Sequence, residues 1–531
     1  MSLPRVTTIA SVVLTSLVLL GGFRAHAQST TAEPVTRPER TAYRETSSYA
    51  DVMEFVRSLA ARSPLVHLTS FGYSYEGRSL PLVVVGRLSA ATPEAARATG
   101  KTVVYVQANI HAGEVCGKEA SLQLLRALAA GEHREWLDSL VLLFAPIYNA
   151  DGNERVRLDN RPGQHGPVGG MGQRANAQDL DLNRDHMKLD APETRSLVGL
   201  MQAWDPHVLM DLHTTNGTRH AYHLVYSPPL HPNTDPAVTD LLRNDWLPAV
   251  TGAVKADRGW DLTYYGNLPY RRDTERGWYT FDHRPRFNTN YIGLRNRFAI
   301  LSEAYAYATF EDRIEATRLF VTAVLDYAYR HAGEIRSVTA RADAADLTGA
   351  PLAVQATFAR GDSVSILLGE VAEERNPYTG QRMLRRLEVA QPERMPEFGS
   401  FRPTETERMP VAYVVPAALT AVLDRLAAHG VRLEPIATAA SRSVERFVID
   451  SIADAPREFQ GHRERTLFGR YEAVEETLPV GAVLVRTAQP LGRLAFALLE
   501  PRSDDGLAAW NFLDPQLKDA RVYPILRIPA P

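Results

Sequence analysis

Short runs of β-branched and apolar residues recur through the first part of this chain of 531 residues, and segments with helical spacing separate them. The runs are "TVVYVQANI" (102–110), "LVLLFAPIYN" (140–149), "HVLMDLH" (207–213) and "RFAILSE" (297–303). Fully apolar strands that alternate with helices are typical of a sheet that is buried on both faces. The sequence therefore predicts an α/β domain over 41–335, with a mixed, largely parallel central sheet flanked by helices.

The pattern changes after residue 335. Beyond it, runs such as "PLAVQATF", "SVSILLGEV" and "VAYVVP" are separated by polar stretches rich in turn residues. One helix is clear: it runs from Pro416 through "AALTAVLDRLAAHG", with Pro in its first turn and Gly430 just past its end. "PLGRLAFALLE" has the look of a strand. We predict a C-terminal α+β domain over 346–531, whose role the sequence leaves open.

The N-terminus has the pattern of an export signal. Arg5 precedes the apolar stretch Val6–Leu20, and Ala25–Ala27 forms a small-residue cleavage site, so we expect 1–27 to be removed. The alternative is an uncleaved anchor, although the stretch is short for a bilayer span. We expect the polar, Pro-containing segment 28–40 to be a flexible leader. The predicted protein is exported, periplasmic or secreted, with no membrane span after signal cleavage.

The net charge limits the classes of binding partner, and the cysteine content limits the sources of stability. A formal net charge of -3 gives no electrostatic footprint for nucleic acid or for an anionic membrane. The single cysteine, Cys116, cannot form an intramolecular disulfide, so stability must come from core packing or from a metal. The oligomeric state stays open, and the substrate has to be inferred from a site.

Side chains of the metal-binding type follow three of the predicted strands. His111 and Glu114 come directly after 102–110, His213 closes the strand at 207–213, and Glu303 closes the strand at 297–303. The carboxyl ends of parallel strands meet at one edge of a sheet. Two histidines and one carboxylate are a common zinc set in hydrolases, with a fourth position left for water. We predict one zinc ion on His111, Glu114 and His213, with Glu303 as general base.

The tetrapeptide "HAGE" occurs twice, at 111–114 and at 331–334. The second copy ends the continuous helical pattern "EDRIEATRLFVTAVLDYAYRHAGE" (311–334), and no strand end precedes it. A histidine in the last helical turn suits the helix dipole, and Gly333 is placed to end the helix. We interpret this copy as a helix cap rather than a metal site.

Together these residues resemble the zinc carboxypeptidase family of the carboxypeptidase A type, whose signature is His-Xaa-Xaa-Glu followed much later by His. The resemblance covers roughly 60–330 and keeps the order of several motifs. "YNADGNERV" (148–156) resembles the family's Asn-Pro-Asp-Gly stretch, with Ala150 in place of Pro, and "DLDLNRD" (179–185) resembles its Asp-Xaa-Asn-Arg motif. "MDLHTT" (210–215) resembles the second-histidine strand, and "AILSEAY" (299–305) resembles the strand that carries the base.

The resemblance implies roles for four more residues. Asp181 would orient a zinc histidine, His111. Asn183 and Arg184 would hold the free carboxylate at the C-terminus of a peptide, Arg184 through a bidentate fork. Arg174 would polarise the scissile carbonyl and stabilise the oxyanion.

A family tyrosine normally closes over the substrate. Tyr291, in "FNTNYIGLRNR", is the candidate here, with Tyr279 and Tyr305 in the same region as alternatives. Glu303 lies in Leu-Ser-Glu-Ala rather than the family's usual Phe-Glu-Leu. No residue could be identified that sets side-chain preference.

Three functional hypotheses follow. The first is an exported zinc metallocarboxypeptidase that hydrolyses C-terminal peptide bonds of a peptide or peptide-like substrate. The second is a zinc-dependent deacylase or peptidoglycan amidase, because "DLHTT" and "DLNR" also resemble stretches of the aspartoacylase-like enzymes. The third is an inactive peptide-binding protein, which would lack a ligand or the base; the sequence lacks neither.

Overall fold

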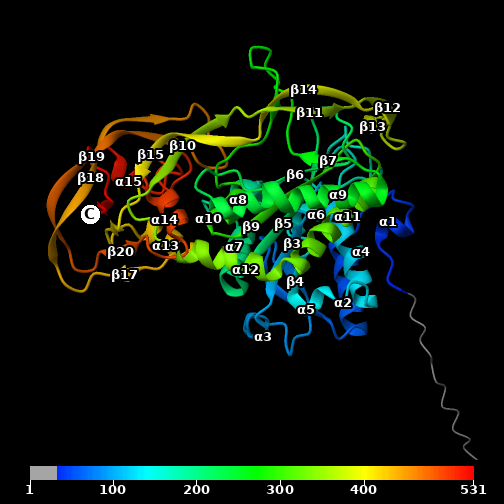
Figure 1. Ribbon diagram of the computed structural model, residues 1–531, viewed down its shortest axis with the longest axis horizontal. Helices are drawn as coiled ribbons and strands as arrows, with labels where there is room; N and C mark the ends of the chain where they lie inside the picture. Colours follow the sequence, from blue (N-terminus) through cyan, green and yellow to red (C-terminus); the bar gives the residue numbers. More distant parts are fainter. Residues whose placement is uncertain (1–32) are drawn as a thin grey trace, which may run out of the picture. The chain divides into compact units, whose positions relative to one another are not determined.

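The computed structural model describes residues 33–531 (Figure 1). The predicted signal, 1–27, and the start of the predicted leader lie outside the described residues. The end of the leader, Arg37–Arg40, already forms the short helix α1, which a Thr36/Glu39 capping box stabilises at its first turn. Ordered structure thus starts earlier than composition indicates. Within the described residues, no helix has the length and apolar character needed to cross a membrane.

An eight-stranded sheet forms the centre of the α/β region, in the order β1-β2-β4-β3-β5-β9-β6-β7. Strands β4, β3, β5 and β9 run parallel to one another, whereas β1–β2, β2–β4 and β6–β9 are antiparallel pairs. This confirms the predicted mixed, largely parallel sheet. The strands are β1 Val66–Tyr73, β2 Ser79–Val85, β3 Thr102–Ala108, β4 Leu140–Ala145, β5 Val208–Thr215, β6 Leu224–Ser227, β7 Leu262–Tyr264 and β9 Phe298–Tyr305.

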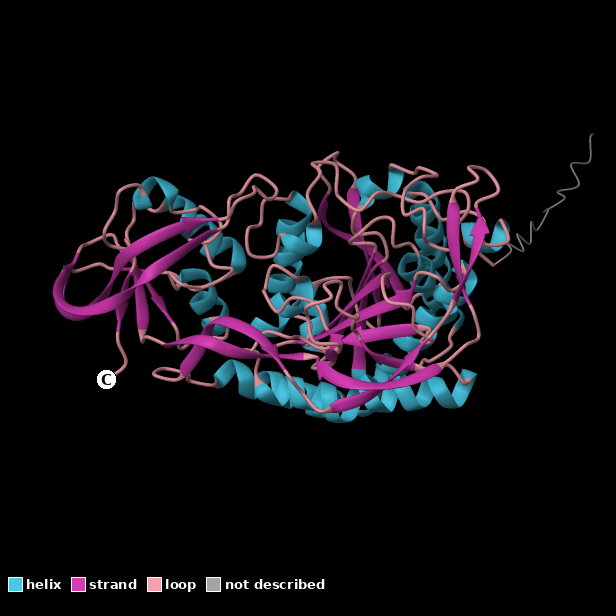
Figure 2. Cartoon of the chain, turned by 90° about the horizontal axis from the view of Figure 1, so that it is seen from above, coloured by secondary structure: helices cyan, strands magenta, loops and turns pink. Residues whose placement is uncertain are grey.

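Helices cover both faces of this sheet (Figure 2). Successive side chains of a strand point to opposite faces. Val104 and Val106 accordingly pack with α2, α4, α9 and α11, while Val103 and Tyr105 pack with α7 and α10. Burial on both sides explains why the strands read as continuous apolar runs. The helices are α2 Tyr49–Arg62, α3 Pro93–Ala98, α4 Cys116–Ala130, α5 Trp136–Ser139, α6 Ala150–Glu154, η1 Leu182–Arg184, α7 Pro192–Trp204, α8 Pro236–Asp240, η2 Leu241–Trp246, α9 Leu247–Arg258, α10 Asn288–Leu294, α11 Phe310–Arg330 and α12 Ala332–Ala344.

The predicted helix stop at Gly333 is wrong. Helix α11 ends at Arg330, the chain bends at His331, and α12 begins directly afterwards with Gly333 inside it. Ile335 and Val338 join the apolar cluster beneath the sheet. Burying such side chains contributes about 1.5–3 kcal/mol each, which outweighs the cost of about 1 kcal/mol for a glycine in a helix.

The C-terminal region contains a six-stranded sheet in the order β17-β20-β16-β21-β18-β19. Helix α13 ends at His429, with Gly430 (φ +85°) just past its end as predicted, but it begins at Thr420 because Pro416 to Leu419 form a turn. "PLGRLAFALLE", interpreted as a strand, contains helix α14, whose residues are all buried. A short helix that is apolar all round shows no periodicity that distinguishes it from a buried strand. The elements are β16 Ala412–Val415, α13 Thr420–His429, β17 Glu434–Pro435, β18 Ala440–Asp454, β19 Arg465–Leu478, β20 Val483–Arg486, α14 Gly492–Leu499, α15 Asp514–Leu517 and β21 Leu526–Ile528.

Residues 360–399, here called the arm, reach back from this region over the α/β region (Figure 1). In the arm, β14 pairs with β11 and, in parallel, with the short strand β8 of the α/β region. The hairpin β12–β13 lies at the far end of the arm. The elements are β8 Trp278–Tyr279, β10 Pro351–Ala359, β11 Ser363–Leu368, β12 Val371–Arg375, β13 Arg382–Arg386, β14 Gln391–Phe398 and β15 Ser400–Arg408, with β10 and β15 paired at the base of the arm.

Candidate metal centre

His111, Glu114 and His213 meet at the carboxyl ends of β3 and β5. All three are buried, and one potential ligand atom from each lies within 4.8 Å of the others. His111 Nδ1 lies 3.0 Å from Glu114 Oε1, and His213 Nδ1 lies 2.8 Å from Glu114 Oε2. Two imidazole nitrogens therefore converge on one carboxylate, which is the donor set that fits a zinc ion in a hydrolase.

A carboxylate also lies behind each histidine. His111 Nε2 is 3.0 Å from Asp181 Oδ1, and His213 Nε2 is 3.0 Å from Asp211 Oδ2. The hydrogen bond to Asp181 keeps the proton of His111 on Nε2 and leaves the lone pair of its Nδ1 free for a metal, whereas Asp211 faces His213 as a charge without hydrogen-bond geometry. Asp211 was missed in the sequence, although a signal existed: it lies two residues before His213 in a strand, and therefore on the same face.

The charges of the cluster also fit a cation. Burial would raise the pKa of Glu114, but Arg161, His111 and His213 hold it well below its usual value. Burial would lower the pKa of His213, but Asp211 and Glu114 raise it well above the usual value. A buried carboxylate that stays ionised beside imidazole nitrogens can serve as a ligand to a divalent metal.

Glu303 lies beside the metal-binding group on the neighbouring strand. The register of β5 and β9 pairs His213 with Glu303, and Glu303 Oε2 is buried without a hydrogen-bond partner in the described structure. Burial is the main reason that the pKa of Glu303 is raised to about 8; Glu114 adds to the effect, whereas His213 opposes it. An unpartnered carboxylate oxygen with a raised pKa is suited to accept a proton.

These residues open into a cavity of about 220 Å³. Its wall is strongly cationic for its size, because it includes three arginines beside two glutamates. The remaining wall is formed by hydroxyl, amide, aromatic and aliphatic side chains. The residues around the cavity are His111, Glu114, Arg161, Arg174, Asn183, Arg184, His213, Thr214, Thr215, Asn216, Tyr265, Phe281, Phe287, Thr289, Leu301 and Glu303.

Arg174 borders both the cavity and the carboxylate behind His111. Its Nε and Nη2 lie 2.9 and 2.8 Å from Asp181 Oδ2, and its Nη1 is 3.9 Å from Glu114. Burial would raise the pKa of Asp181, but His111 and Arg174 lower it well below its usual value. Arg174 is thus fixed beside the metal-binding group, with its side chain 46% exposed.

Asn183 and Arg184 lie together in the short helix η1. Asn183 Oδ1 accepts the backbone N–H of Asn288 at 2.8 Å, which fixes the orientation of its amide. The Arg184 guanidinium stacks on the ring of Phe287 at 3.8 Å and donates to the Asn183 carbonyl at 2.6 Å. In the described part of the chain it forms no ion pair with a carboxylate, and burial lowers its pKa. A cation with free donors therefore faces the cavity.

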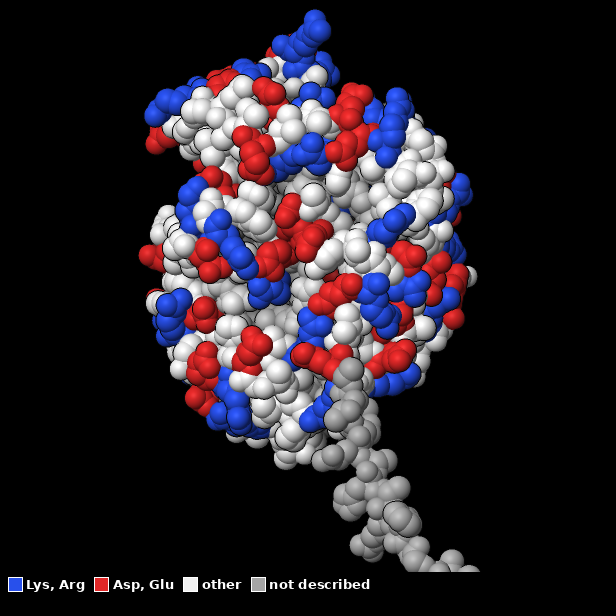
Figure 3. Space-filling view, turned by 90° about the vertical axis from the view of Figure 1, so that its right-hand side faces the viewer, with Lys and Arg blue, Asp and Glu red and all other residues white. Residues whose placement is uncertain are grey.

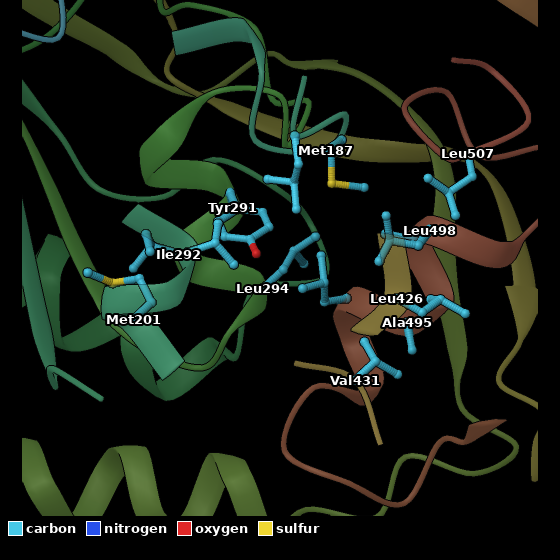
Figure 4. Packing of buried hydrophobic residues seen from close by; sticks show 14 of the residues in the cluster. Met187, Met201, Tyr291, Ile292, Leu294, Leu426, Val431, Ala495, Leu498 and Leu507 are labelled. Carbon is cyan, nitrogen blue, oxygen red and sulfur yellow. The ribbon is translucent and has the colours of Figure 1, made fainter. Parts of the chain in front are cut away.

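Tyr291 does not lie at the cavity, so the predicted contact with substrate needs correction. Its hydroxyl is fully buried, 2.8 Å from His429 Nδ1, and Arg295 donates to it at 3.2 Å. Figure 4 shows its ring among residues of α10, α13 and α14. The physical reason is that α10 turns this side toward the C-terminal helices, which could not be foreseen from a local pattern.

The alternative tyrosines are also engaged elsewhere. Tyr279 stacks on Phe398 of the arm at 4.1 Å, and Tyr305 packs on His220 at 4.0 Å. The tyrosine that does line the cavity is Tyr265, which follows β7. Its position in "LTYYGN" carries no signal for a site.

Comparisons with known proteins relate the chain to carboxypeptidases. Residues 52–223 match the family model described as zinc carboxypeptidase. The chain is 24% identical over 496 residues to Carboxypeptidase 2 of Trichophyton rubrum, covering 89% of this chain and 85% of the relative. It is 32% identical over 137 residues to Carboxypeptidase M of Mus musculus, covering 25% of this chain and 28% of the relative. A metallo-carboxypeptidase structure from Burkholderia cenocepacia aligns with a TM-score of 0.40 and 17% identity, covering 54% of this chain and 70% of that chain.

A largely parallel sheet whose carboxyl edge joins two histidines, a carboxylate and a free glutamate defines a zinc-dependent hydrolase. More particularly, residues 52–223 match a zinc carboxypeptidase domain, and relatives that are carboxypeptidases align with most of the chain, which supports a zinc metallocarboxypeptidase. The matched residues include the three candidate ligands, Arg174 and Arg184, whereas Glu303 lies beyond them.

Proposed function

We propose that this protein is an exported zinc carboxypeptidase that removes the C-terminal residue of peptides. The observation that carries the proposal is Arg184, whose guanidinium lies in the same cavity as Glu303 and the metal-binding group and pairs with no carboxylate among residues 33–531. A free α-carboxylate matches such a guanidinium through two parallel hydrogen bonds. An enzyme that cleaves within a chain has no need of this contact.

The residues divide the chemistry between them. His111, Glu114 and His213 would hold the zinc ion, which would supply Lewis acidity and lower the pKa of a water. Glu303 would accept a proton at Oε2 from the attacking water and return it to the leaving amine. Arg174 stabilises the negative charge that develops on the carbonyl oxygen. Asn183, fixed by Asn288, and Arg184 hold the C-terminal carboxylate.

A substrate panel tests the proposal. It pairs peptides that carry a free C-terminal carboxylate with the same peptides amidated, and adds N-acyl amino acids. We expect cleavage of the free peptides only. Glu303→Gln should retain zinc and lose turnover, and Arg184→Ala should lower kcat/KM by about 10- to 100-fold, as expected for a lost charge-assisted hydrogen bond.

The same panel contains the contrary outcomes. Equal cleavage of amidated peptides, or a preference for N-acyl amino acids, would replace the carboxypeptidase by the amidase or deacylase. A zinc-loaded protein that binds the peptides and cleaves none of the panel would point to a binding protein.

Export is proposed from the sequence of residues 1–27 alone. Mass spectrometry of the protein from the cell envelope or medium should find a chain that starts at Gln28; an intact Met1 terminus in the cytosol would contradict it. A peptide rather than a nucleic acid partner suits the net charge of -3 and the interspersed acidic and basic side chains on the face in Figure 3.

A further inference from the structure

A third arginine, Arg161, lines the cavity, and neither metal binding nor terminal carboxylate binding accounts for it. It lies in the loop between α6 and η1, with φ +50°. Its Nη2 donates to Glu114 Oε1 at 2.6 Å, and its Nε is buried without a hydrogen-bond partner in the described structure. A non-glycine residue in the left-handed region costs about 1 kcal/mol or more, so the surrounding structure must hold it there.

The first HAGE segment leaves room for this arginine. A Cβ on Gly113 would lie 2.8 Å from Arg161 Nε and 2.7 Å from the carbonyl oxygen of Gly172. Only a residue without a side chain allows the guanidinium to approach the metal-binding group so closely. The position of Arg161 is therefore built into the packing around residue 113.

The arm holds the same loop from the outside. The backbone N–H of Leu384 donates to the Gly163 carbonyl at 3.2 Å, and His165 Nε2 lies 2.9 Å from Glu374 Oε2. Hairpin β12–β13 thus fixes the loop on one side while Arg161 faces the cavity on the other. This gives a C-terminal segment a direct part in shaping the site.

The contacts of the three arginines order them along the cavity. Arg161 contacts Glu114, Arg174 contacts Asp181 and comes within 3.9 Å of Glu114, and Arg184 forms an ion pair with neither carboxylate. If a C-terminal carboxylate lies at Arg184 and the scissile carbonyl at Arg174, the chain on the acyl side of the bond reaches Arg161.

The position of Arg161 indicates what it can bind. Its guanidinium lines the cavity, and Glu114 engages one of its terminal nitrogens, Nη2. A carboxylate on the acyl side would match the other terminal nitrogen through a charge-assisted hydrogen bond.

We propose that Arg161 is a specificity-determining residue that binds a carboxylate on the acyl side of the scissile bond. The preferred peptides then carry Glu or Asp immediately before the C-terminal residue. This inference rests on the proposed carboxypeptidase function, because Arg184 sets the direction in which the substrate lies.

Two peptides that differ only in Glu or Gln at the penultimate position test it. For the wild-type protein we expect kcat/KM to favour the Glu peptide by about 10- to 100-fold, the range of a charge-assisted hydrogen bond. Arg161→Gln should bring the ratio close to one with zinc content unchanged, and Arg161→Lys should keep part of it. The matched control is Arg157→Gln, since Arg157 is 69% exposed and pairs with Asp159; it should keep the full ratio.

Binding gives a second measure that needs no turnover. In the Glu303→Gln background, the Kd should favour the Glu peptide, and Arg161→Gln should remove that preference. Equal kcat/KM for both peptides in the wild-type protein overturns the proposal. So does an Arg161→Gln variant that loses zinc or slows both peptides equally, since Arg161 would then only support Glu114. If the wild-type protein cleaves neither free peptide, the proposed function itself fails, and this inference fails with it.

Discussion

The two HAGE segments have the same internal geometry and opposite surroundings. His111 Nδ1 lies 3.0 Å from Glu114, and His331 Nδ1 lies 3.0 Å from Glu334. The first pair has side chains that are 4% and 5% exposed, whereas those of the second are 39% and 52% exposed. Spacing of three residues thus brings a histidine to a glutamate in either setting. It does not by itself make a metal site.

The difference lies in what the rest of the chain adds. The first segment receives His213 from β5, Asp181 from a loop and Arg161 from another. The second, between α11 and α12, receives a stacking contact from Tyr327, whose ring lies 4.0 Å from that of His331. A third donor and a dry surrounding are tertiary properties, and they convert a common pair into a binding site.

Removing the histidine from each copy should give the largest contrast. His111→Ala removes one of three ligands, so zinc content after dialysis should fall below about a tenth of an equivalent. His331→Ala should keep the zinc content of the wild-type protein. Metal analysis of the two purified variants measures this, and the comparison breaks if both lose zinc or both retain it.

Asp181→Asn tests the carboxylate behind the first histidine. It leaves all three ligands in place but weakens the contact that orients His111, so zinc affinity should fall by about 10- to 100-fold. Competition with a chelator measures the Kd. An unchanged Kd would show that the 3.0 Å contact between His111 and Asp181 does not prepare the ligand.

Acid should release zinc from the first segment. Asp211 and Glu114 raise the pKa of His213 well above its usual value, so the metal-free site holds a proton that zinc must displace. Because the protonated form competes, the Kd should fall about tenfold for each unit of rising pH, until the pH passes that pKa. Titration between pH 6 and 8 measures the slope. Asp211→Asn should flatten it, and a wild-type Kd independent of pH would contradict the prediction.

The glycines of the two copies should respond in opposite directions to alanine. At Gly113 the new Cβ would meet the Gly172 carbonyl oxygen at 2.7 Å, which backbone cannot easily relieve, so a loss of about 1–3 kcal/mol in unfolding free energy is expected. Gly333 lies inside α12, and none of the described residues has an atom within 4 Å of the new Cβ, so alanine there should stabilise by about 0.5–1 kcal/mol. Urea unfolding of the two variants tests the signs, and equal signs would refute the contrast.

The features of the fold and site that could be predicted from the sequence are those set by local patterns, and those set by tertiary contacts could not be predicted. The parallel strands and the candidate ligands at their ends could be predicted, because apolar runs mark buried strands and strand ends share one sheet edge. Arg161 and Tyr265 could not, since each reaches the cavity from a loop whose path depends on distant contacts. Tyr291 lies at the expected position in the sequence, but its hydroxyl forms a hydrogen bond with His429 Nδ1 instead of facing the cavity.

The C-terminal region shows a second reason why some elements could not be predicted from the sequence. Its strands could be recognised as apolar runs, but every residue of α14 is buried, so its sequence shows no helical periodicity of apolar residues. The sequence did not predict helix α12 after His331, because Gly333 is of a residue type that usually ends helices. The helix forms nonetheless, because Ile335 and Val338 are buried in the apolar cluster. Local rules fail in both places where tertiary packing outweighs them.

The smallest effect is expected from the exposed ion pair itself. Glu334→Gln removes the charge that faces His331, and a pair this exposed contributes at most about 0.5 kcal/mol because solvent screens it. Raising the salt to 1 M, where the Debye length is about 3 Å, should erase even that difference. Unfolding of the variant and the wild-type protein at low and high salt measures it. A loss of more than about 1 kcal/mol that persists in 1 M salt would mean that the second pair is supported by its surroundings after all. The contrast between the two segments would then rest on the missing third ligand alone and not on burial.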